Sequence, residues 1–325
     1  DLARPQGGQG HAHHALGEYA DAENAFAAAE KVRADLKLPP DAESITLASS
    51  MGANLRAQQR YEQALQRLRD AEQLARALSP PQPQTLGQVL QVVAQTLFDA
   101  GDYQGAERYA REGLTMLDGV VFEGNDLYAN ALSTLANAVS RQFRLEEAEK
   151  LQRAFIERQR KQLGAEHILV GRALNNFGVF LRLKGDYAEG EQALKEALPI
   201  FAQTDPKGVD VGTATHNLGS LHREAGHLQR ADSELQRAIE LKKLGGGPRS
   251  PPLVSTLLER TAMFRELGRL QEARAIFAEA QSIAAERFDR NDRRHTTVLI
   301  ESGRLKLAGG RAAGAVAELR TAVEQ

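Results

Sequence analysis

The chain has 325 residues, 42% of them hydrophobic, and contains neither cysteine nor tryptophan. The absence of cysteine excludes disulfides, thiolate catalysis and cysteine-based zinc sites. Its 41 basic and 43 acidic residues give a net charge of −2, so no excess of positive charge favours nucleic acid or an anionic membrane as a partner.

From the N-terminus onward, one residue recurs at a nearly fixed interval, usually within the phrase Gly-x-Tyr-x-x-Ala. Six of the seven intervals are 42 residues long and one is 41. We call this residue the anchor of its repeat, and the anchors are Tyr19, Tyr61, Tyr103, Leu145, Tyr187, Leu228, Leu270 and Ala312. Such a period predicts an array of supersecondary units that bury their apolar faces against one another. The expected repeats are approximately 1–39, 40–81, 82–123, 124–165, 166–206, 207–248, 249–290 and 291–325, the first and last incomplete.

Each repeat is predicted to be a helix, a tight turn and a second helix. Before Tyr187, for example, the segment ALNNFGVFLRLKG carries an apolar stripe at helical spacing, and YAEGEQALKEALPIF carries another after the turn. Loops rich in Pro and Gly separate the repeats, and Asp or Ser in them can cap the next helix. These loops lie at 39–41, 80–83, 124–126, 164–167, 205–208 and 245–252. No segment alternates like a strand, so the predicted fold class is all-α.

Small residues keep a fixed distance from the anchor. Nine residues before it stand Gly52, Ala94, Ala136, Gly178, Gly219, Thr261 and Gly303. Small residues at such a position predict that two helix backbones approach too closely for a bulky side chain. Two residues before the anchor, from Gly17 onward, glycine stands in six of eight repeats, with Gln59 and Phe143 as the exceptions. Glycine there predicts a turn with positive φ at the end of the first helix.

These spacings resemble the tetratricopeptide repeat, and the 42-residue period is similar to that of the repeats of kinesin light chain. The likeness extends over nearly the whole chain and is clear in segments such as TATHNLGSLHREAGHLQRADSELQRAIEL. It implies a right-handed superhelical solenoid whose first helices line a concave groove. Local departures are Phe143 at the turn, Gly190 at the first packing alanine and Ala312 at the last anchor.

Residue patterns typical of catalysis or cofactor binding are lacking in the sequence. The glycine-rich segment Gly245–Ser250 lacks the Gly-Lys-Ser/Thr ending of a phosphate-binding loop, and no strand precedes it. His11, His13 and His14 could chelate a metal through their imidazoles, but we interpret them as a solvated terminus. We therefore predict no enzyme activity, no cofactor and no metal site.

Polar residues on the first helices are the candidate binding site, at positions five, eight, twelve and fifteen before the anchor. Four arginines at the first of these positions would form a broken basic stripe, partly neutralised by the adjacent Glu224 and Glu266. Amides both donate and accept, which suits an extended peptide backbone, and a guanidinium group matches a carboxylate. The candidate residues are Arg56, Gln91, Gln95, Asn130, Asn137, Arg172, Asn175, Arg182, His216, Arg223 and Arg265. The resemblance implies that Asn175, Asn176 and Asn217 match an Asn-Asn element of the kinesin-light-chain first helix.

We therefore expect a non-catalytic scaffold that binds a peptide segment of a partner protein in this groove. Two alternatives stay open: a sensor or regulatory arm of a larger bacterial signalling protein, such as a kinase or ATPase, and a structural array that self-associates. The shortened first and last repeats indicate a fragment of a longer chain or ends covered by a partner. Near-neutral charge and few aromatic residues argue against a nucleic-acid partner. No apolar run is long enough to span a membrane, and we expect a cytoplasmic protein.

Overall fold

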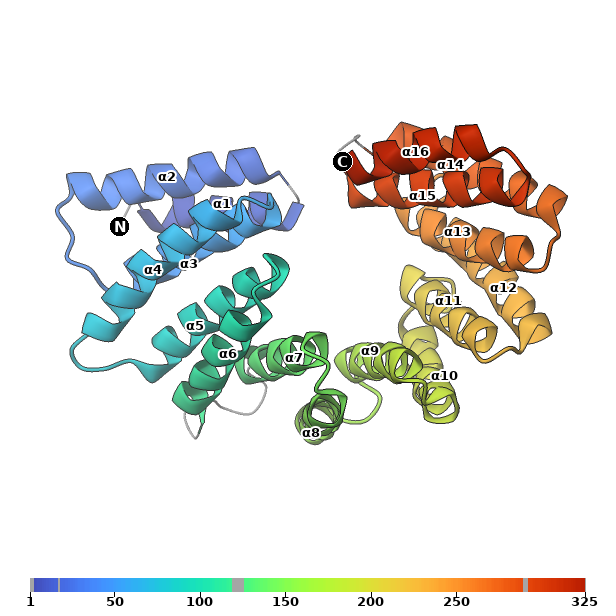
Figure 1. The fold of residues 1–325 in the computed structure, drawn as a ribbon. Helices are drawn as coiled ribbons and strands as arrows, with labels where there is room; N and C mark the ends of the chain where they lie inside the picture. Colours follow the sequence, from blue (N-terminus) through green and yellow to red (C-terminus); the bar gives the residue numbers. More distant parts are fainter. Residues whose placement is uncertain (1–2, 17, 119–125, 289–291, 325) are drawn as a thin grey trace. The chain divides into compact units, whose positions relative to one another are not determined.

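The computed structural model describes residues 3–16, 18–118, 126–288 and 292–324. Within these ranges it contains sixteen α-helices and no strand, which confirms the predicted all-α class (Figure 1). The chain divides into two compact units, unit 1 at Asp1–Leu163 and unit 2 at Gly164–Gln325. The boundaries of the individual repeats stay a prediction. In the described ranges, no helix combines the length and the apolar character needed to cross a bilayer.

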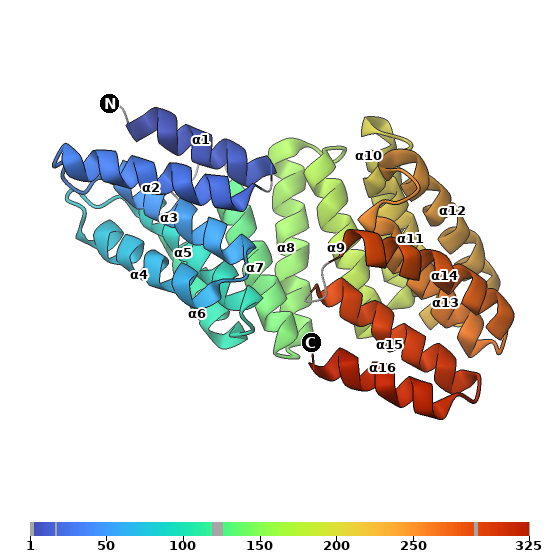
Figure 2. The ribbon, with the colours of Figure 1, turned by 90° about the horizontal axis from the view of Figure 1, so that it is seen from above.

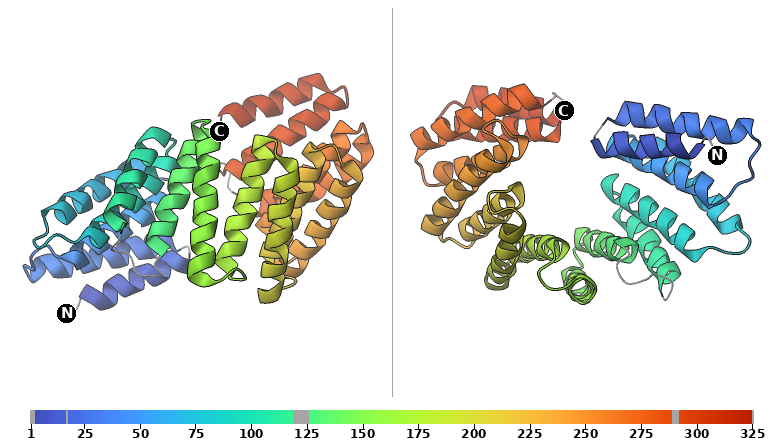
Figure 3. Two further views of the ribbon diagram at one scale, coloured as in Figure 1. Left: turned by 90° about the horizontal axis from the view of Figure 1, so that it is seen from below. Right: turned by 180° about the vertical axis from the view of Figure 1, so that it is seen from behind.

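Each unit contains four helical hairpins, and each hairpin has a first helix, a short turn and a second helix. The helices of unit 1 are α1 (Ala3–Leu16), α2 (Tyr19–Asp35), α3 (Ala42–Ala57), α4 (Tyr61–Ala77), α5 (Pro83–Asp99), α6 (Tyr103–Leu117), α7 (Asp126–Arg141) and α8 (Leu145–Leu163). The helices of unit 2 are α9 (Ile168–Lys184), α10 (Tyr187–Thr204), α11 (Val209–Glu224), α12 (Leu228–Gly246), α13 (Pro251–Glu266), α14 (Leu270–Arg287), α15 (Arg293–Ala308) and α16 (Ala312–Glu324). Within each unit the hairpins stack in chain order (Figures 2 and 3).

The predicted anchors mark the start of the second helices. Each anchor, from Tyr19 in α2 to Ala312 in α16, is the first residue of its helix. The residue two before it has positive φ wherever the structure describes it, between 72° and 94° at the five glycines. Gln59 and Phe143 adopt the same turn with φ of 62° and 61°, although side chains disfavour this region. Gly17, the remaining turn glycine, lies outside the described residues.

The small residues nine before the anchor lie where the two helices of a hairpin touch. A Cβ added to Gly52 would lie 2.6 Å from Cγ of Leu68, and one added to Gly178 would lie 2.6 Å from Cγ of Leu194. The same clash would occur at 2.8 Å between Gly219 and Leu235 and at 2.7 Å between Gly303 and Leu319. Glycine is therefore needed where a leucine of the second helix packs directly on the first helix, as the spacing predicted.

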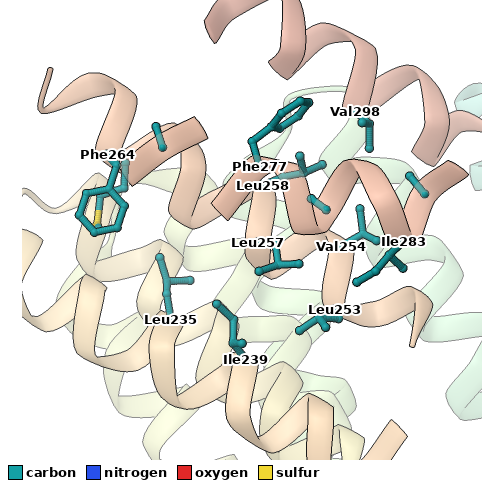
Figure 4. Packing of buried hydrophobic residues seen from close by; sticks show 14 of the residues in the cluster. Leu235, Ile239, Leu253, Val254, Leu257, Leu258, Phe264, Phe277, Ile283 and Val298 are labelled. Carbon is teal, nitrogen blue, oxygen red and sulfur yellow. The ribbon is translucent and has the colours of Figure 1, made fainter. Parts of the chain in front are cut away.

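One core cluster of unit 2 shows how neighbouring hairpins share their apolar surface. Leu253, Val254 and Leu257 of α13 lie between Leu235 of α12 and Ile283 of α14 (Figure 4). All five side chains are at most 3% exposed. Because the cluster draws on four successive helices, α12 to α15, from three hairpins, no single hairpin could bury this surface alone.

Helix contacts place the first helices on the inner side of each stack. Consecutive first helices contact each other, as α3 with α5 and α11 with α13. Consecutive second helices make no such contact among the described residues, and each packs against the next first helix, as α4 against α5. The first helices are thus closer together, so the face that they present is the shorter, inner one.

The loop before α3 illustrates how one hairpin is joined to the next. Asp41 caps α3: its Oδ1 accepts the Ser44 backbone N–H at 2.9 Å, and Ser44 Oγ accepts the Asp41 N–H at 2.9 Å. Arg33 of α2 donates from Nη2 to the same Asp41 Oδ1 at 2.6 Å. This reciprocal cap fixes the start of α3, and the arginine ties it to the preceding helix.

Candidate functional site

The first helices of unit 1 are joined by a chain of polar contacts. Thr134 Oγ1 of α7 donates to Gln95 Oε1 of α5 at 3.0 Å, and Gln95 Nε2 donates to Asp99 Oδ1 at 3.1 Å. Arg56 Nη1 of α3 lies 3.5 Å from Asp99 Oδ2. Two predicted residues, Arg56 and Gln95, therefore belong to one network that crosses three hairpins. The network uses part of the hydrogen-bonding capacity of both side chains.

Four other amides on α5 and α7 have no side-chain hydrogen bond to any described residue: Gln88, Gln91, Asn130 and Asn137. The two glutamines are half-buried, and the two asparagines are exposed. Spacings of three residues on α5 and seven on α7 place each pair on one face of its helix, and these two helices contact each other. The inner face of unit 1 therefore offers amide donors and acceptors that only solvent satisfies.

In unit 2 the predicted arginines of the inner face form ion pairs. Arg172 Nη2 of α9 lies 3.1 Å from Asp210 Oδ2 of α11. Arg182, near the other end of α9, pairs with Glu224 at the end of α11. Both predicted arginines are thus bound to the next hairpin of the same unit.

Arg223 and Arg265 continue this ladder of ion pairs. Arg223 of α11 donates from Nε to Glu259 Oε1 at 2.8 Å and from Nη1 to Glu266 Oε2 at 2.9 Å, both on α13. Arg265 of α13 donates from Nε to Glu301 Oε1 of α15 at 2.8 Å. Burial alone would lower the pKa of Arg223, but Glu259 and Glu266 raise it above its ordinary value.

The carboxylates that neutralise the arginines come from the following repeat. Arg223 Nη2 lies 3.8 Å from Glu224, its neighbour in sequence, and Arg223 Nε lies only 2.8 Å from Glu259. Likewise, Arg265 Nη2 lies 3.7 Å from Glu266, its neighbour in sequence, and Arg265 Nε lies only 2.8 Å from Glu301 of α15. The basic stripe is therefore balanced in charge. The sequence contains a signal for this pairing, because acidic residues stand four or eleven residues before the next anchor.

The asparagines that match the kinesin-light-chain element bond to one another. Asn217 Nδ2 of α11 donates to Asn175 Oδ1 of α9 at 2.8 Å. Asn175 Nδ2 in turn donates to Asn176 Oδ1 at 3.4 Å, a long contact. Asn175 is thus partly engaged within the unit, and Asn176 remains exposed beside it.

His216 is the one predicted residue whose titration is strongly altered. Burial is the main reason that its pKa falls to about 3, and the positive charges of Lys242 and Arg182 lower it further. Its Nδ1 is buried and has no hydrogen-bond partner among the described residues. At neutral pH His216 is therefore an uncharged ring on the inner side of α11.

Lys242 of α12 is a buried cation that our sequence analysis did not single out. Its side chain is almost fully buried, and Nζ donates to Thr256 Oγ1 at 2.8 Å and to the Pro252 carbonyl at 3.1 Å. No carboxylate pairs with it among the described residues, and burial lowers its pKa to about 8. Arg33 occupies the same place in the first repeat, fourteen residues after the anchor, so alignment of the repeats could have revealed this position.

The N-terminal histidines do not converge into one chelating group. His14 Nδ1 hydrogen-bonds with Asn54 Oδ1 at 2.9 Å, and the His11 ring meets Phe26 edge-on with centroids 5.3 Å apart. His13 Nδ1 instead hydrogen-bonds with Oε2 of Glu18, the residue that precedes α2, at 2.6 Å. The three imidazoles therefore have three separate environments.

A cleft in unit 1 contains none of the predicted residues. This cleft of about 410 Å³ lies between α2, α3 and α4, lined by Glu23, Met51, Asn54, Leu55, Arg60, Gln63, Gln66, Arg67 and Asp70. Its arginines are paired, since Arg60 Nη1 lies 2.7 Å from Glu23 and Arg67 Nη1 lies 3.2 Å from Glu30. A smaller cleft of about 230 Å³ in unit 2 includes Arg172 and Asp210.

Comparison with protein families agrees with the repeat pattern. One family model, described as tetratricopeptide repeat, matches residues 169–243. Another model of the same description matches residues 88–117 and 129–169. Among curated proteins, none matches this chain. The matched segments lie in both units, so the same kind of repeat builds each of them.

Solved structures with the same fold include three of different kinds. Repeats of a putative kinesin light chain from Podosopora anserina are 18% identical, with a TM-score of 0.53 over 64% of this chain and 99% of that one. The quorum sensor NprR from B. thuringiensis, in its apo form, is 15% identical, with a TM-score of 0.74 over 99% of this chain and 87% of that one. A Rap protein in complex with competence and sporulation factor is 16% identical, with a TM-score of 0.60 over 93% and 79%. At these identities the likeness establishes the fold.

Proposed function

Because the chain is a tetratricopeptide repeat protein whose 42-residue repeats are similar to those of kinesin light chain, we propose that it is a non-catalytic scaffold that binds a peptide segment of a partner protein. The peptide would lie on the inner face formed by the first helices. We further propose that the protein acts in the cytoplasm and binds neither nucleic acid nor membrane.

The observation that carries this proposal is the set of open amides on α5 and α7. Gln88, Gln91, Asn130 and Asn137 have unused donors and acceptors on the inner side of unit 1. An extended peptide exposes alternating N–H and C=O groups, and amide side chains can bond both kinds. These residues, with the partly engaged Gln95, therefore suit a peptide backbone.

The inner face of unit 2 would contribute in a different way. Its arginines Arg182, Arg223 and Arg265 are already paired with carboxylates, so a ligand carboxylate would have to displace an existing partner. Such an exchange returns little net energy, because the new ion pair replaces an existing one and the ligand carboxylate must give up its own hydration. We therefore assign the main recognition of the peptide to unit 1 and a lesser role to the arginines and Asn175.

A second candidate function is favoured by the likeness to NprR, which covers 99% of this chain. That protein is a quorum sensor, and the Rap structure contains competence and sporulation factor. By analogy, this chain would be a sensor arm whose ligand changes its conformation. Small-angle X-ray scattering with and without a bound peptide separates the two: a changed profile favours the sensor, and an unchanged profile favours the scaffold.

The peptide proposal is tested by selecting random linear peptides displayed on phage against the full chain. The selected peptides are then measured by fluorescence anisotropy with the double variant Asn130→Ala/Asn137→Ala. Loss of several hydrogen bonds should weaken binding at least tenfold, at about 1 kcal/mol per bond. The matched control is Asn24→Ala/Gln104→Ala, which removes two exposed amides from the second helices α2 and α6. Equal binding by both variants would place the peptide elsewhere.

A further inference from the structure

Three side chains around the end of α1 and the start of α2 could ligate a metal ion, and only His13 belongs also to the three histidines considered in the sequence analysis. Ligand atoms of His13, Glu18 and Asp21 all lie within 4.8 Å of one another. His13 comes from the end of α1, Glu18 is the residue that precedes α2, and Asp21 lies in the first turn of α2. Nothing in the peptide-binding proposal uses these residues.

Local backbone structure holds the three groups together. The Glu18 backbone N–H donates to the His13 carbonyl at 2.9 Å, which closes the turn around the two residues. Glu18 occupies the N-cap position of α2, yet its carboxylate makes no capping hydrogen bond. That carboxylate instead approaches His13, with Oε2 2.6 Å from Nδ1. A residue placed to cap a helix is therefore turned toward an imidazole.

The surroundings leave this group available to an ion. The side chains of His13 and Glu18 are 39% and 49% exposed, and Asp21 is exposed as well. Asp21 has no side-chain partner among the described residues. The neighbouring histidines do not compete, because His14 bonds to Asn54 and His11 packs on Phe26.

We propose that His13, Glu18 and Asp21 bind a divalent transition-metal ion, with Zn²⁺ as the ion that fits best. One imidazole nitrogen and two carboxylate oxygens form a mixed set of donors that suits zinc, and water would complete a tetrahedron. Mg²⁺ and Ca²⁺ prefer oxygen ligands only, so the imidazole disfavours them. The ion would connect the end of α1 to the start of α2 and stabilise the first hairpin.

Metal binding would replace the hydrogen bond between His13 and Glu18. His13 Nδ1 lies 2.6 Å from Glu18 Oε2, and both atoms would turn from each other toward the ion. A bond from Nδ1 to the ion uses the lone pair of that nitrogen, so the hydrogen of the neutral ring is on Nε2.

The test is isothermal titration calorimetry at neutral pH, in which ZnCl2 alone is added to the full chain after treatment with a chelator. We expect one ion per chain, with binding weakened at least tenfold in His13→Ala and in Asp21→Asn. His11→Ala is the matched control, because it removes a neighbouring imidazole of α1, and it should bind zinc like the wild type.

Two results would overturn the proposal. One is the absence of zinc binding by the wild-type chain, and the other is undiminished binding by His13→Ala. Because Glu18 and Asp21 are exposed and His13 is only half-buried, circular dichroism should report the same helix content in every variant. Loss of zinc binding therefore cannot be mistaken for loss of the fold, and peptide binding on α5 and α7 provides an independent readout.

Discussion

Unit 1 and unit 2 are built from the same hairpin, but their inner faces are satisfied in different ways. In unit 1 the first helices expose amides that bond to solvent, as at Asn130 and Asn137. In unit 2 the equivalent surface is occupied by arginine–glutamate pairs between successive hairpins, as at Arg223. The repeat pattern therefore dictates the packing, whereas the inner positions are free to carry either a closed ion-pair ladder or an open binding face.

A second difference concerns the buried cation fourteen residues after the anchor. In unit 1, Arg33 lies 2.6 Å from Asp41 and 3.3 Å from Glu43. In unit 2, Lys242 Nζ donates to the Pro252 carbonyl and to Thr256 Oγ1, both in α13, and no carboxylate of the described residues pairs with it. One position in the repeat thus holds a paired charge in one unit and an unpaired charge in the other.

The largest effect is expected from pH, acting on Lys242. Its pKa is lowered from 10.5 to about 8 in the folded chain, so the unfolded chain binds more protons between these two values. Stability of unit 2 should therefore rise with pH across this window, by about 3 kcal/mol in total. Below pH 8 the folded chain must hold the charged ammonium group in a buried site, and the gain is absent.

Lys242→Met isolates this contribution, because methionine fills similar space without a charge. Urea unfolding followed by circular dichroism between pH 7 and pH 11 should show the rise in the wild type and a flatter profile in the variant. Arg33→Met is the matched control: a guanidinium group does not titrate in this range, so its profile should run parallel to that of the wild type. Parallel profiles for Lys242→Met and the wild type would contradict the prediction.

A smaller effect is expected when the inner-face arginines are removed. Arg223 is 19% exposed and donates to two carboxylates, so Arg223→Ala should lower the free energy of unfolding by about 2 kcal/mol. Arg56 is 28% exposed and has one ionic contact at 3.5 Å, so Arg56→Ala should cost about 0.5 kcal/mol. Urea denaturation of both variants measures the difference. Equal losses would show that the ladder of unit 2 is no stronger than the single contact in unit 1.

The sequence was sufficient for the fold because its signals are local and repeated. The anchors mark the first residues of the second helices, and Gly52 and Gly178 stand where leucines pack on the first helices. Each of these features depends on residues within one hairpin and recurs in several repeats. Periodicity therefore identifies them even when individual repeats depart from the pattern, as at Phe143.

The candidate site was harder to predict because its contacts join different repeats. Arg223 and Arg265 were recognised, but their carboxylate partners lie 36 residues further along the chain. Which acid an arginine reaches depends on the stacking of hairpins and on rotamers, and a single sequence does not encode these openly. Lys242 was missed for another reason, since a buried lysine looks like any polar residue on an amphipathic helix until the repeats are aligned.

The smallest expected effect concerns the turns, where the units differ again. All four turns of unit 2 place glycine at positive φ, whereas unit 1 has Gln59 and Phe143 at this position in two turns and glycine in the turn at Gly101. The Phe143 side chain is 88% exposed, so Phe143→Gly removes no packing and relieves the strain of positive φ. Part of the gain is cancelled by the greater freedom of glycine in the unfolded chain, which leaves about 0.5 kcal/mol of stabilisation.

The reciprocal change completes this comparison of turns. Gly185, with φ of 94°, has no atom near its would-be Cβ, so Gly185→Ala introduces backbone strain without a steric clash. We expect it to lower the stability of unit 2 by about 1 kcal/mol, measured by urea denaturation beside Phe143→Gly. Opposite signs would show that unit 1 tolerates a strained turn that unit 2 avoids. If Phe143→Gly instead destabilises the chain, the turn is not strained, and the exposed ring must stabilise unit 1 through contacts on its surface.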